Sequence, residues 1–186
     1  QKNDSLIDVA SGTGDLAKLF YKKTNTNNKI ICVEPNIDML NEGKNKLKNY
    51  SNIKWHQATA EKLPFADNSF DFYTISFGIR NVNDINKSLK EAHRVLRTGG
   101  RFMCLEFSKI ENESLEKLYK TYSKIIPQIG KYIVGNEMPY EYLVNSIKKF
   151  YNQRELLTLL EQNKFSSLEF RNLSNGIAAI HSGWKI

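Results

Sequence analysis

The sequence predicts an α/β fold in which helices flank a mostly parallel sheet of seven strands. Short apolar runs of strand length alternate with segments whose apolar residues recur every three or four positions. Glycine, proline and asparagine punctuate the chain between these segments. The last two strand-like runs are joined by Ser174-Asn175-Gly176, a turn signal typical of hairpins, so the end of the sheet should be antiparallel.

The predicted strands are runs of neighbouring apolar residues, as expected of strands that are buried on both faces. They cover 5–10, 29–34, 53–57, 70–76, 101–107, 167–173 and 176–185. The predicted helices have one apolar stripe. They cover 16–23, 37–49, 85–96, 114–126, 140–150 and 153–163. The third helix should stop before Thr98-Gly99-Gly100. Strand–helix alternation implies right-handed parallel crossovers.

The whole chain, 1–186, is predicted to form one domain, with an irregular helical stretch of about 110–151 inserted as a cap over the site. The chain has no apolar run of eighteen residues, and its first residues form no apolar segment of the signal-peptide kind. It also lacks an initial methionine and opens just before a strand, so we expect that an upstream segment has been removed. Cys32 and Cys104 lie inside predicted buried strands and are expected to be reduced core thiols.

The composition is basic, with 27 Lys and Arg against 20 Asp and Glu and a net charge of +7. Such a surplus suits contact with nucleic acid, attraction to anionic lipid, or only a solvated lysine-rich surface. The lysines do not gather into one dense run, and no nucleic-acid-binding motif is present. A nucleic-acid-binding module is therefore the remote alternative, and no nucleic-acid partner is expected.

The loop after the first strand carries the main functional signal. Gly12-Thr13-Gly14 and the residues after it match G-x-G-x-x-A, the pattern of a dinucleotide site. Three acids surround this loop: Asp8 in the first strand, Asp15 after the second glycine and Glu34 at the end of the second strand. Carboxylates beside a pyrophosphate, which carries about two negative charges, would cost energy in a poorly screened cleft.

S-adenosylmethionine suits these acids better, because it offers a sulfonium, an ammonium and two ribose hydroxyls. The glycines would let the backbone approach this ligand closely, and Asp8 or Asp15 would meet its cationic methionine end. Glu34 follows Gly14 by 20 residues, the spacing at which a carboxylate accepts hydrogen bonds from a ribose. A tight turn with solvent-facing acids and a dehydrogenase site remain the alternatives.

Two segments after the third strand fit the same cofactor. Ala58-Thr59-Ala60-Glu61 is placed to hold an adenine through backbone and small polar contacts. Leu63-Pro64-Phe65 would wall that pocket or act as a plain packing turn. Ser76 ends the fourth strand at the edge of the sheet where ligands bind in such folds.

Longer stretches resemble a known family. Asp8-Val-Ala-Ser-Gly-Thr-Gly-Asp-Leu16 resembles the first motif of class I methyltransferases, which implies a Rossmann-like sheet. Thr74-Ile-Ser-Phe-Gly-Ile-Arg-Asn-Val82, the stretch 94–108 and the C-terminal 176–185 are similar to the UbiE family of ubiquinone and menaquinone C-methyltransferases. Ser11 replaces a usual glycine, Glu34 a frequent aspartate and Arg97-Thr98 a common Lys-Pro. The family also carries an N-terminal motif near the active site that is missing here.

The resemblance implies S-adenosylmethionine as cofactor, with contacts on Thr13, Glu34, Thr59, Ala60 and Ser76. It implies methylation of a ring carbon of a polyprenylated benzoquinol or naphthoquinol; another small phenol or a lipid amine is the alternative acceptor. The implied location is the bacterial cytoplasm at the inner membrane face, or the mitochondrial matrix at the inner membrane. The partners that follow are the quinol, a membrane surface, other quinone-biosynthesis enzymes and a second copy in a homodimer.

Arg80 and Asn81, just after the fourth strand, are the catalytic candidates. A guanidinium would steady the phenolate or orient a water, but it is too weak an acid to be the base itself. Asn81 would hold a ring oxygen. Arg80 could instead form a structural ion pair with Asp84 or Glu106. Five tyrosines of the predicted cap would line a groove for the quinol or pack the cap: Tyr119, Tyr122, Tyr132, Tyr140 and Tyr142. Three histidines lack the pattern of a triad or metal site: His56, His93 and His181.

Overall fold

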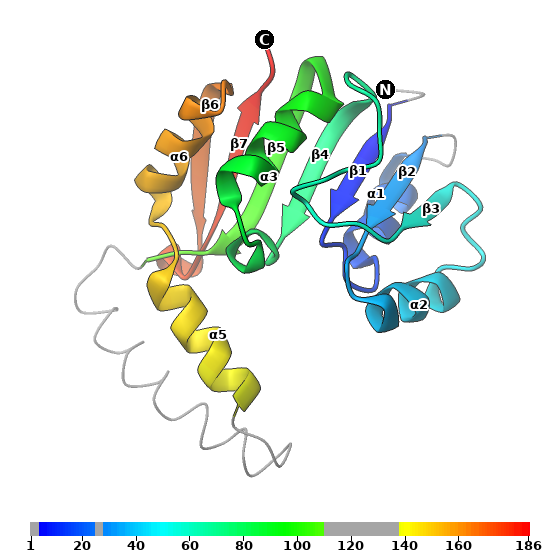
Figure 1. Ribbon diagram of the computed structural model, residues 1–186, viewed down its shortest axis with the longest axis horizontal. Helices are drawn as coiled ribbons and strands as arrows, with labels where there is room; N and C mark the ends of the chain where they lie inside the picture. The colour runs from blue at the N-terminus through cyan, green and yellow to red at the C-terminus, as the bar shows by residue number, and fades with distance from the viewer. Residues whose placement is uncertain (1–3, 25–27, 110–137) are drawn as a thin grey trace.

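The computed structural model describes residues 4–24, 28–109 and 138–186, and these form a seven-stranded sheet with helices on both faces (Figure 1). The strand order is β3-β2-β1-β4-β5-β7-β6. The strands are β1 Leu6–Val9, β2 Ile30–Val33, β3 Ile53–His56, β4 Phe70–Ser76, β5 Leu96–Phe107, β6 Ser166–Leu173 and β7 Ala178–Trp184. The first five pair in parallel, whereas β7 runs antiparallel to both β5 and β6. The predicted mostly parallel sheet with a C-terminal hairpin is confirmed.

The helices follow the predicted order within the described residues. They are α1 Asp15–Thr24, α2 Ile37–Lys46, α3 Ile85–Val95, α5 Met138–Lys149 and α6 Gln153–Gln162. Asn36, Asp84 and Asn152 cap the N-termini of α2, α3 and α6 by accepting backbone N–H bonds. The predicted helix over 114–126, and most of the predicted cap, lie outside the described residues.

Two predicted boundaries were wrong for tertiary reasons. The second helix was expected to reach residue 49, but α2 ends at Lys46 because Leu47 leaves the helical conformation and is buried in the core beneath α1. The glycine pair after α3 does not form its C-cap. α3 ends at Val95, before Thr98 as predicted, but β5 begins at Leu96 rather than at residue 101. Gly99, with a φ of +78°, therefore lies within an irregular part of β5.

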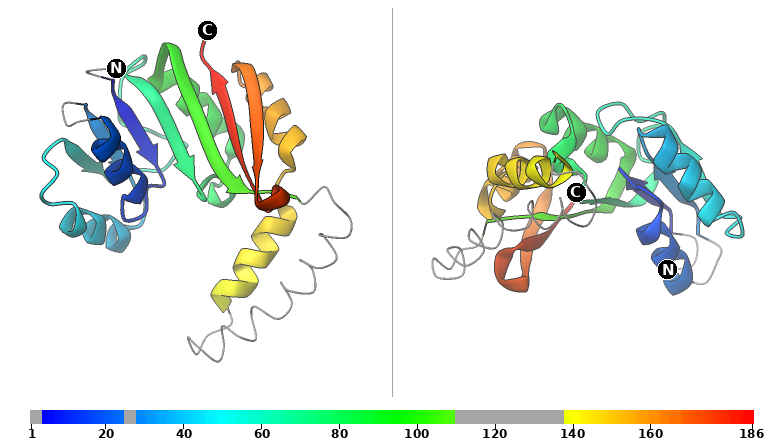
Figure 2. Two further views of the ribbon diagram at one scale, coloured as in Figure 1. Left: turned by 180° about the vertical axis from the view of Figure 1, so that it is seen from behind. Right: turned by 90° about the horizontal axis from the view of Figure 1, so that it is seen from below.

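Two apolar cores lie on opposite faces of the sheet. Seen from opposite sides, α3 and α6 cover one face and α1 lies on the other (Figures 1 and 2). Alternation along β2 separates the two cores, because Ile31 and Val33 contact one and Ile30 and Cys32 the other. No helix among the described residues combines the length and apolar character needed to span a bilayer.

The strand order places the functional edge. The chain runs outward from β1 to β2 and β3, then returns to the other side of β1 to form β4. Ligands of open α/β sheets bind at such a switch point, beyond the carboxyl ends of the strands. The loops after β1, β2 and β4 therefore meet at the edge where a ligand should lie.

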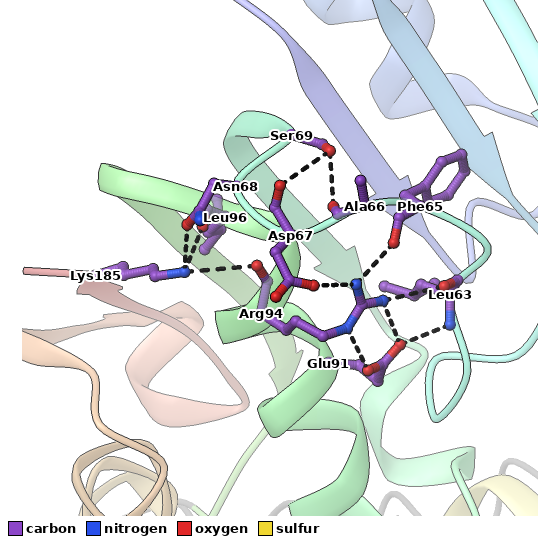
Figure 3. A network of polar contacts seen from close by, with 10 residues as sticks. All are labelled: Leu63, Phe65, Ala66, Asp67, Asn68, Ser69, Glu91, Arg94, Leu96 and Lys185. Atoms are coloured by element: carbon purple, nitrogen blue, oxygen red, sulfur yellow. Dashed lines mark hydrogen bonds and ion pairs between the residues drawn. The ribbon is translucent and has the colours of Figure 1, made fainter.

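A polar network around Arg94 secures the loop that leads into β4 (Figure 3). The guanidinium donates to both carboxylate oxygens of Glu91, to Asp67 Oδ1 at 2.8 Å, and to the carbonyls of Leu63 and Phe65. Glu91 Oε2 also accepts the Leu63 N–H at 2.8 Å. One arginine thus fixes both ends of the turn that carries Leu63 and Phe65.

Replacing Arg94 by methionine should destabilise the fold by about 1–3 kcal/mol, because two partly buried carbonyls and the Glu91 carboxylate lose their donor. Urea unfolding at pH 7 measures the change. Arg97→Met is the matched control, since Arg97 is half exposed and its ion pair with Asp71 should contribute about 1 kcal/mol or less. Equal losses in the two variants would contradict the structural role of the network.

Candidate active site

A cleft of about 770 Å³ opens at the predicted edge, between the loops that follow β1, β2 and β4. All the predicted cofactor residues except Gly14 line this cleft. They are Asp8, Gly12, Thr13, Asp15, Glu34, Thr59, Ala60 and Ser76. Asn81 also lines the cleft, whereas Arg80 does not. Residues separated by up to 73 positions in the chain are thus brought together at one site.

Glu34 is held in a fixed orientation at the end of β2. Its side chain is buried, and its Oε2 accepts the Gly12 N–H at 2.8 Å while its Oε1 accepts the Asn36 N–H at 3.0 Å. Each carboxylate oxygen retains a further lone pair. The two backbone hydrogen bonds orient the Glu34 carboxylate toward the cleft before a ligand binds. A ligand with two neighbouring hydroxyls would therefore meet a preorganised pair of acceptor oxygens.

Asp8 presents an unpaired carboxylate oxygen. It lies in the middle of β1 and is only 1% exposed. Its Oδ1 accepts the Thr74 hydroxyl at 2.7 Å, but its Oδ2 has no hydrogen-bond partner among the described residues. Burial raises the pKa of Asp8 to about 7; the Thr74 bond opposes this shift, and the nearby charge of Glu34 adds to it. A buried acid in this state favours a cationic or hydrogen-donating ligand.

The glycine loop is shaped by two different constraints. Gly12 has a φ of +56°, and its backbone N–H reaches Glu34 across the cleft. Gly14 has a φ of +81°, and a Cβ there would lie 2.7 Å from Leu47 and 2.9 Å from Trp55. Gly14 therefore permits α1 to pack closely against α2 and β3, which explains why it does not line the cleft.

Asp15 and Thr13 are joined to a lysine at the rim. Lys46 Nζ lies 2.8 Å from Asp15 Oδ1 and donates to Thr13 Oγ1 at 3.0 Å. The Lys46 bond is the main reason that the pKa of Asp15 is lowered. Part of the negative charge that the sequence placed on this loop is thus neutralised by α2. Sequence reasoning missed Lys46, because nothing distinguishes it from its neighbouring lysines.

The turn after β4 closes the cleft from the other side. Phe77 adopts a φ of +53°, and Gly78 lies so near the loop after β1 that an added Cβ would be 2.5 Å from the Ala10 Cβ. A short helical turn, Ile79–Asn81, follows at once. The crowding leaves the Ser76 and Asn81 side chains at the cleft wall, where they were expected.

Arg80 forms the structural ion pair that the sequence had left open. Its Nη1 donates to Glu106 Oε1 and to the Phe77 carbonyl, each at 2.7 Å. Both side chains are buried, with 8% and 1% of their surface exposed. Burial raises the pKa of Glu106 while the Arg80 charge opposes that rise. The partner is Glu106 rather than Asp84, which caps α3 instead.

Asn81 makes a contact that the sequence did not predict. Its Oδ1 accepts the hydroxyl of Tyr142 at 3.0 Å, which joins α5 to the turn after β4. The remaining tyrosines of the predicted cap lie outside the described side chains. Because the two residues are 61 positions apart, only the fold reveals the pair.

The histidines take no part in the cleft. His93 packs edge-on against Phe165, and His56 against Phe65, as expected for packing residues. His181 is buried in β7, with Nε2 3.0 Å from the Gln153 carbonyl oxygen. Burial lowers the pKa of His181. None of them lines the cleft, so the cleft's chemistry rests on its carboxylates and amides.

The charge of the cleft tests which cofactor fits. The described lining residues include four acids, Asp8, Asp15, Glu34 and Glu61, and no lysine, arginine or histidine. A pyrophosphate would therefore meet repulsion from these carboxylates, and Lys46 at the rim is already paired with Asp15. S-adenosylmethionine fits, because the free Asp8 oxygen can face its positive end and Glu34 can accept from its ribose hydroxyls.

Comparisons with known proteins agree with this fit. The chain is 50% identical to the ubiquinone/menaquinone biosynthesis C-methyltransferase UbiE of Rickettsia prowazekii, over 99% of the chain and 77% of that protein. It is 46% identical to UbiE of Brucella abortus, over 97% of the chain and 68% of that protein.

A solved structure agrees on the fold. The chain matches an S-adenosylmethionine-dependent methyltransferase from Thermotoga maritima, described as a possible histamine N-methyltransferase, with a TM-score of 0.70. The identity is 22%, and the match covers 100% of this chain and 84% of that one. The sequence model of the ubiE/COQ5 methyltransferase family matches residues 1–185. The chain therefore belongs to the ubiE/COQ5 methyltransferase family.

Proposed function

We propose that this protein transfers the methyl group of S-adenosylmethionine to a ring carbon of a polyprenylated hydroquinone. The observation that carries the proposal is the acidic cleft at the switch point of the sheet, in a chain of the ubiE/COQ5 methyltransferase family. The relatives from Rickettsia and Brucella are named for C-methylation in ubiquinone and menaquinone biosynthesis. The acceptor class is taken from these names, and the cofactor from the family and the charge of the cleft.

The proposed cofactor contacts follow the cleft from one end to the other. Asp8 would face the cationic methionine end, and Glu34 would accept from the ribose hydroxyls. Thr59 and Ala60 would border the adenine. The loop residues and the end of β4 would complete the site: Gly12, Thr13, Asp15 and Ser76. Gly14 would act indirectly, by letting α1 pack closely behind the loop.

The bound cofactor supplies an activated methyl group, so the protein's main task is alignment of the acceptor carbon with it. The ring carbon would form a bond to the methyl group as the methyl–sulfur bond breaks and leaves its electron pair on sulfur. The carbon would then lose its proton to water, which restores the aromatic ring. Loss of the adjacent hydroxyl proton makes this carbon nucleophilic. Asn81 lines the cleft and would donate a hydrogen bond to the resulting ring oxyanion.

Arg80 would act as a positioning residue beneath this turn. Its guanidinium holds the Phe77 carbonyl and the buried Glu106, and it faces a neighbouring cleft rather than the one with the acids. We assign it to holding Phe77 to Asn81 in place, because its positive charge is already paired with the buried Glu106 carboxylate.

A polyprenyl tail resides in the bilayer, which supports the proposal that the protein docks at a membrane surface. The lysine-rich composition would assist attraction to anionic lipid. We also propose, on the resemblance alone, association with other quinone-biosynthesis enzymes and with a second copy of the chain.

The test is incubation of the protein with radiolabelled S-adenosylmethionine and membranes that accumulate demethylated quinol. We expect label in the extracted quinone fraction, and none with Glu34→Ala. Parallel incubations with a demethylated benzoquinol and naphthoquinol would assign the acceptor ring. Label only in a small phenol or a lipid amine would favour the alternative acceptor and overturn the quinol proposal.

A further inference from the structure

The contact between Tyr142 and Asn81 crosses from α5 to the wall of the cofactor cleft. The Tyr142 hydroxyl donates to Asn81 Oδ1 at 3.0 Å, and α5 packs against the short helical turn that contains Asn81. The Tyr142 side chain is otherwise well exposed, at 60% of its surface. A tyrosine so exposed contributes little to the core, so its hydroxyl bond is the feature that requires an explanation.

That bond holds the Asn81 amide in place, with its Oδ1 end accepting the Tyr142 hydroxyl. An amide carries an acceptor oxygen and a donor nitrogen on separate branches of one carbon, and they exchange places on a 180° flip. With Oδ1 occupied by the Tyr142 hydroxyl, Nδ2 is left as the donor end of this amide. Without the hydroxyl, either end could face the cleft.

We infer that Tyr142 is a positioning residue that anchors the Asn81 amide at the cleft wall, so that its Nδ2 can donate to the ring oxyanion of the acceptor. This inference rests on the proposed function, in which a phenolate oxygen develops beside the cleft. A donor stabilises that charge, whereas a flipped carbonyl oxygen would repel it. The Tyr142 bond also polarises the amide and strengthens its N–H donors.

Kinetics of Tyr142→Phe would test the inference. The variant keeps the ring and loses only the hydroxyl, so it should fold normally and bind S-adenosylmethionine with unchanged affinity. Its kcat should fall about 10-fold to 100-fold, less than the roughly 100-fold to 1,000-fold for outright removal of an oxyanion donor, because Asn81 itself remains. Tyr151→Phe is the matched control, because Tyr151 lines the same small cleft beside α5 and also keeps its ring after substitution. An unchanged kcat in Tyr142→Phe would overturn the inference.

A double-mutant cycle separates positioning from direct contact with the substrate. If Tyr142 acts through Asn81, then Tyr142→Phe should cause no further loss of kcat in an Asn81→Ala background. An equal additional loss in that background would show that Tyr142 acts independently, and would overturn the assignment. Wild-type protein must methylate the quinol for this cycle to be measured, so failure of the proposed function is recognised separately.

A spectroscopic readout is independent of turnover. The side-chain amide signals of Asn81, assigned by their loss in Asn81→Ala, should be sharp in the wild-type protein and broadened or shifted in Tyr142→Phe. The Tyr151→Phe variant should leave them unchanged. Amide signals that are identical in wild type and Tyr142→Phe would contradict the fixed orientation.

Discussion

Replacing Asp8 by asparagine is expected to stabilise the ligand-free protein at pH 8 while weakening its affinity for S-adenosylmethionine. The two effects have one cause. Asp8 is buried and has a pKa of about 7, so at pH 8 the folded chain carries a poorly solvated negative charge. Asparagine keeps the acceptor for the Thr74 hydroxyl and removes the charge.

The sign of the pH dependence follows from the two pKa values. The folded value is about 7 and the ordinary value is 3.8, so between them the folded chain binds the proton more tightly than the unfolded chain does. The stability of the wild type should therefore fall as the pH rises from about 4 to 7. About three pKa units at 1.36 kcal/mol each set an upper bound of about 4 kcal/mol for the gain in Asp8→Asn at pH 8.

Urea unfolding at pH 4 and pH 8 checks this prediction. The stability difference between Asp8→Asn and wild type should be largest at pH 8 and should nearly vanish at pH 4. Calorimetric titration should show affinity for S-adenosylmethionine rising with pH through 7 in the wild type but not in the variant. A variant that is less stable than wild type at pH 8 would contradict the unpaired state of the carboxylate.

Glu34→Gln should cause the largest loss of cofactor affinity, about 100-fold to 1,000-fold. Two ribose bonds to a carboxylate contribute about 1.5–2 kcal/mol each, and 1.4 kcal/mol corresponds to tenfold. Glutamine also offers only one oxygen, so its amide nitrogen would face the N–H of Gly12 or Asn36. Glu34→Asp is the control that retains the charge, and it should bind within about tenfold of wild type.

A truncated ligand distinguishes the two acids. Methylthioadenosine keeps the ribose and adenine of the cofactor but lacks the amino-acid portion and the positive sulfur. Calorimetric titrations should show that Glu34→Gln weakens both ligands by similar factors, whereas Asp8→Asn weakens only S-adenosylmethionine. An equal loss of affinity for both ligands in Asp8→Asn would show that Asp8 does not contact the methionine end of the cofactor.

Local signals explain how much of the fold could be predicted. The apolar strand runs and the stripes of the helices depend on residues a few positions apart, and the structure confirms their order. Gly12 and Gly14 marked a tight loop after the first strand, and the structure shows that both have a positive φ there. The spacing from Gly14 to Glu34 implied that both residues lie at the same edge of the sheet, because successive parallel strands end on the same side.

The boundaries failed where packing overrides local preference. Leu47 continues the helical pattern of α2, yet it leaves the helix to be buried beneath α1. Likewise, Gly99 looked like the stop signal of the third helix, but α3 has already ended at Val95 and Gly99 lies in an irregular part of β5. In both cases, a neighbour distant in sequence determines the conformation.

The sequence by itself determined the elements, the glycine loop and the set of acids, because periodicity and charge are written along the chain. Only the tertiary structure decided that β7 lies between β5 and β6, that Lys46 neutralises Asp15, and that Arg80 pairs with Glu106. It also decided that Asp8 Oδ2 is left unpaired and that Tyr142 reaches Asn81. These features depend on which distant segments become neighbours, and that choice is made by burial of the apolar faces, which local pattern does not specify.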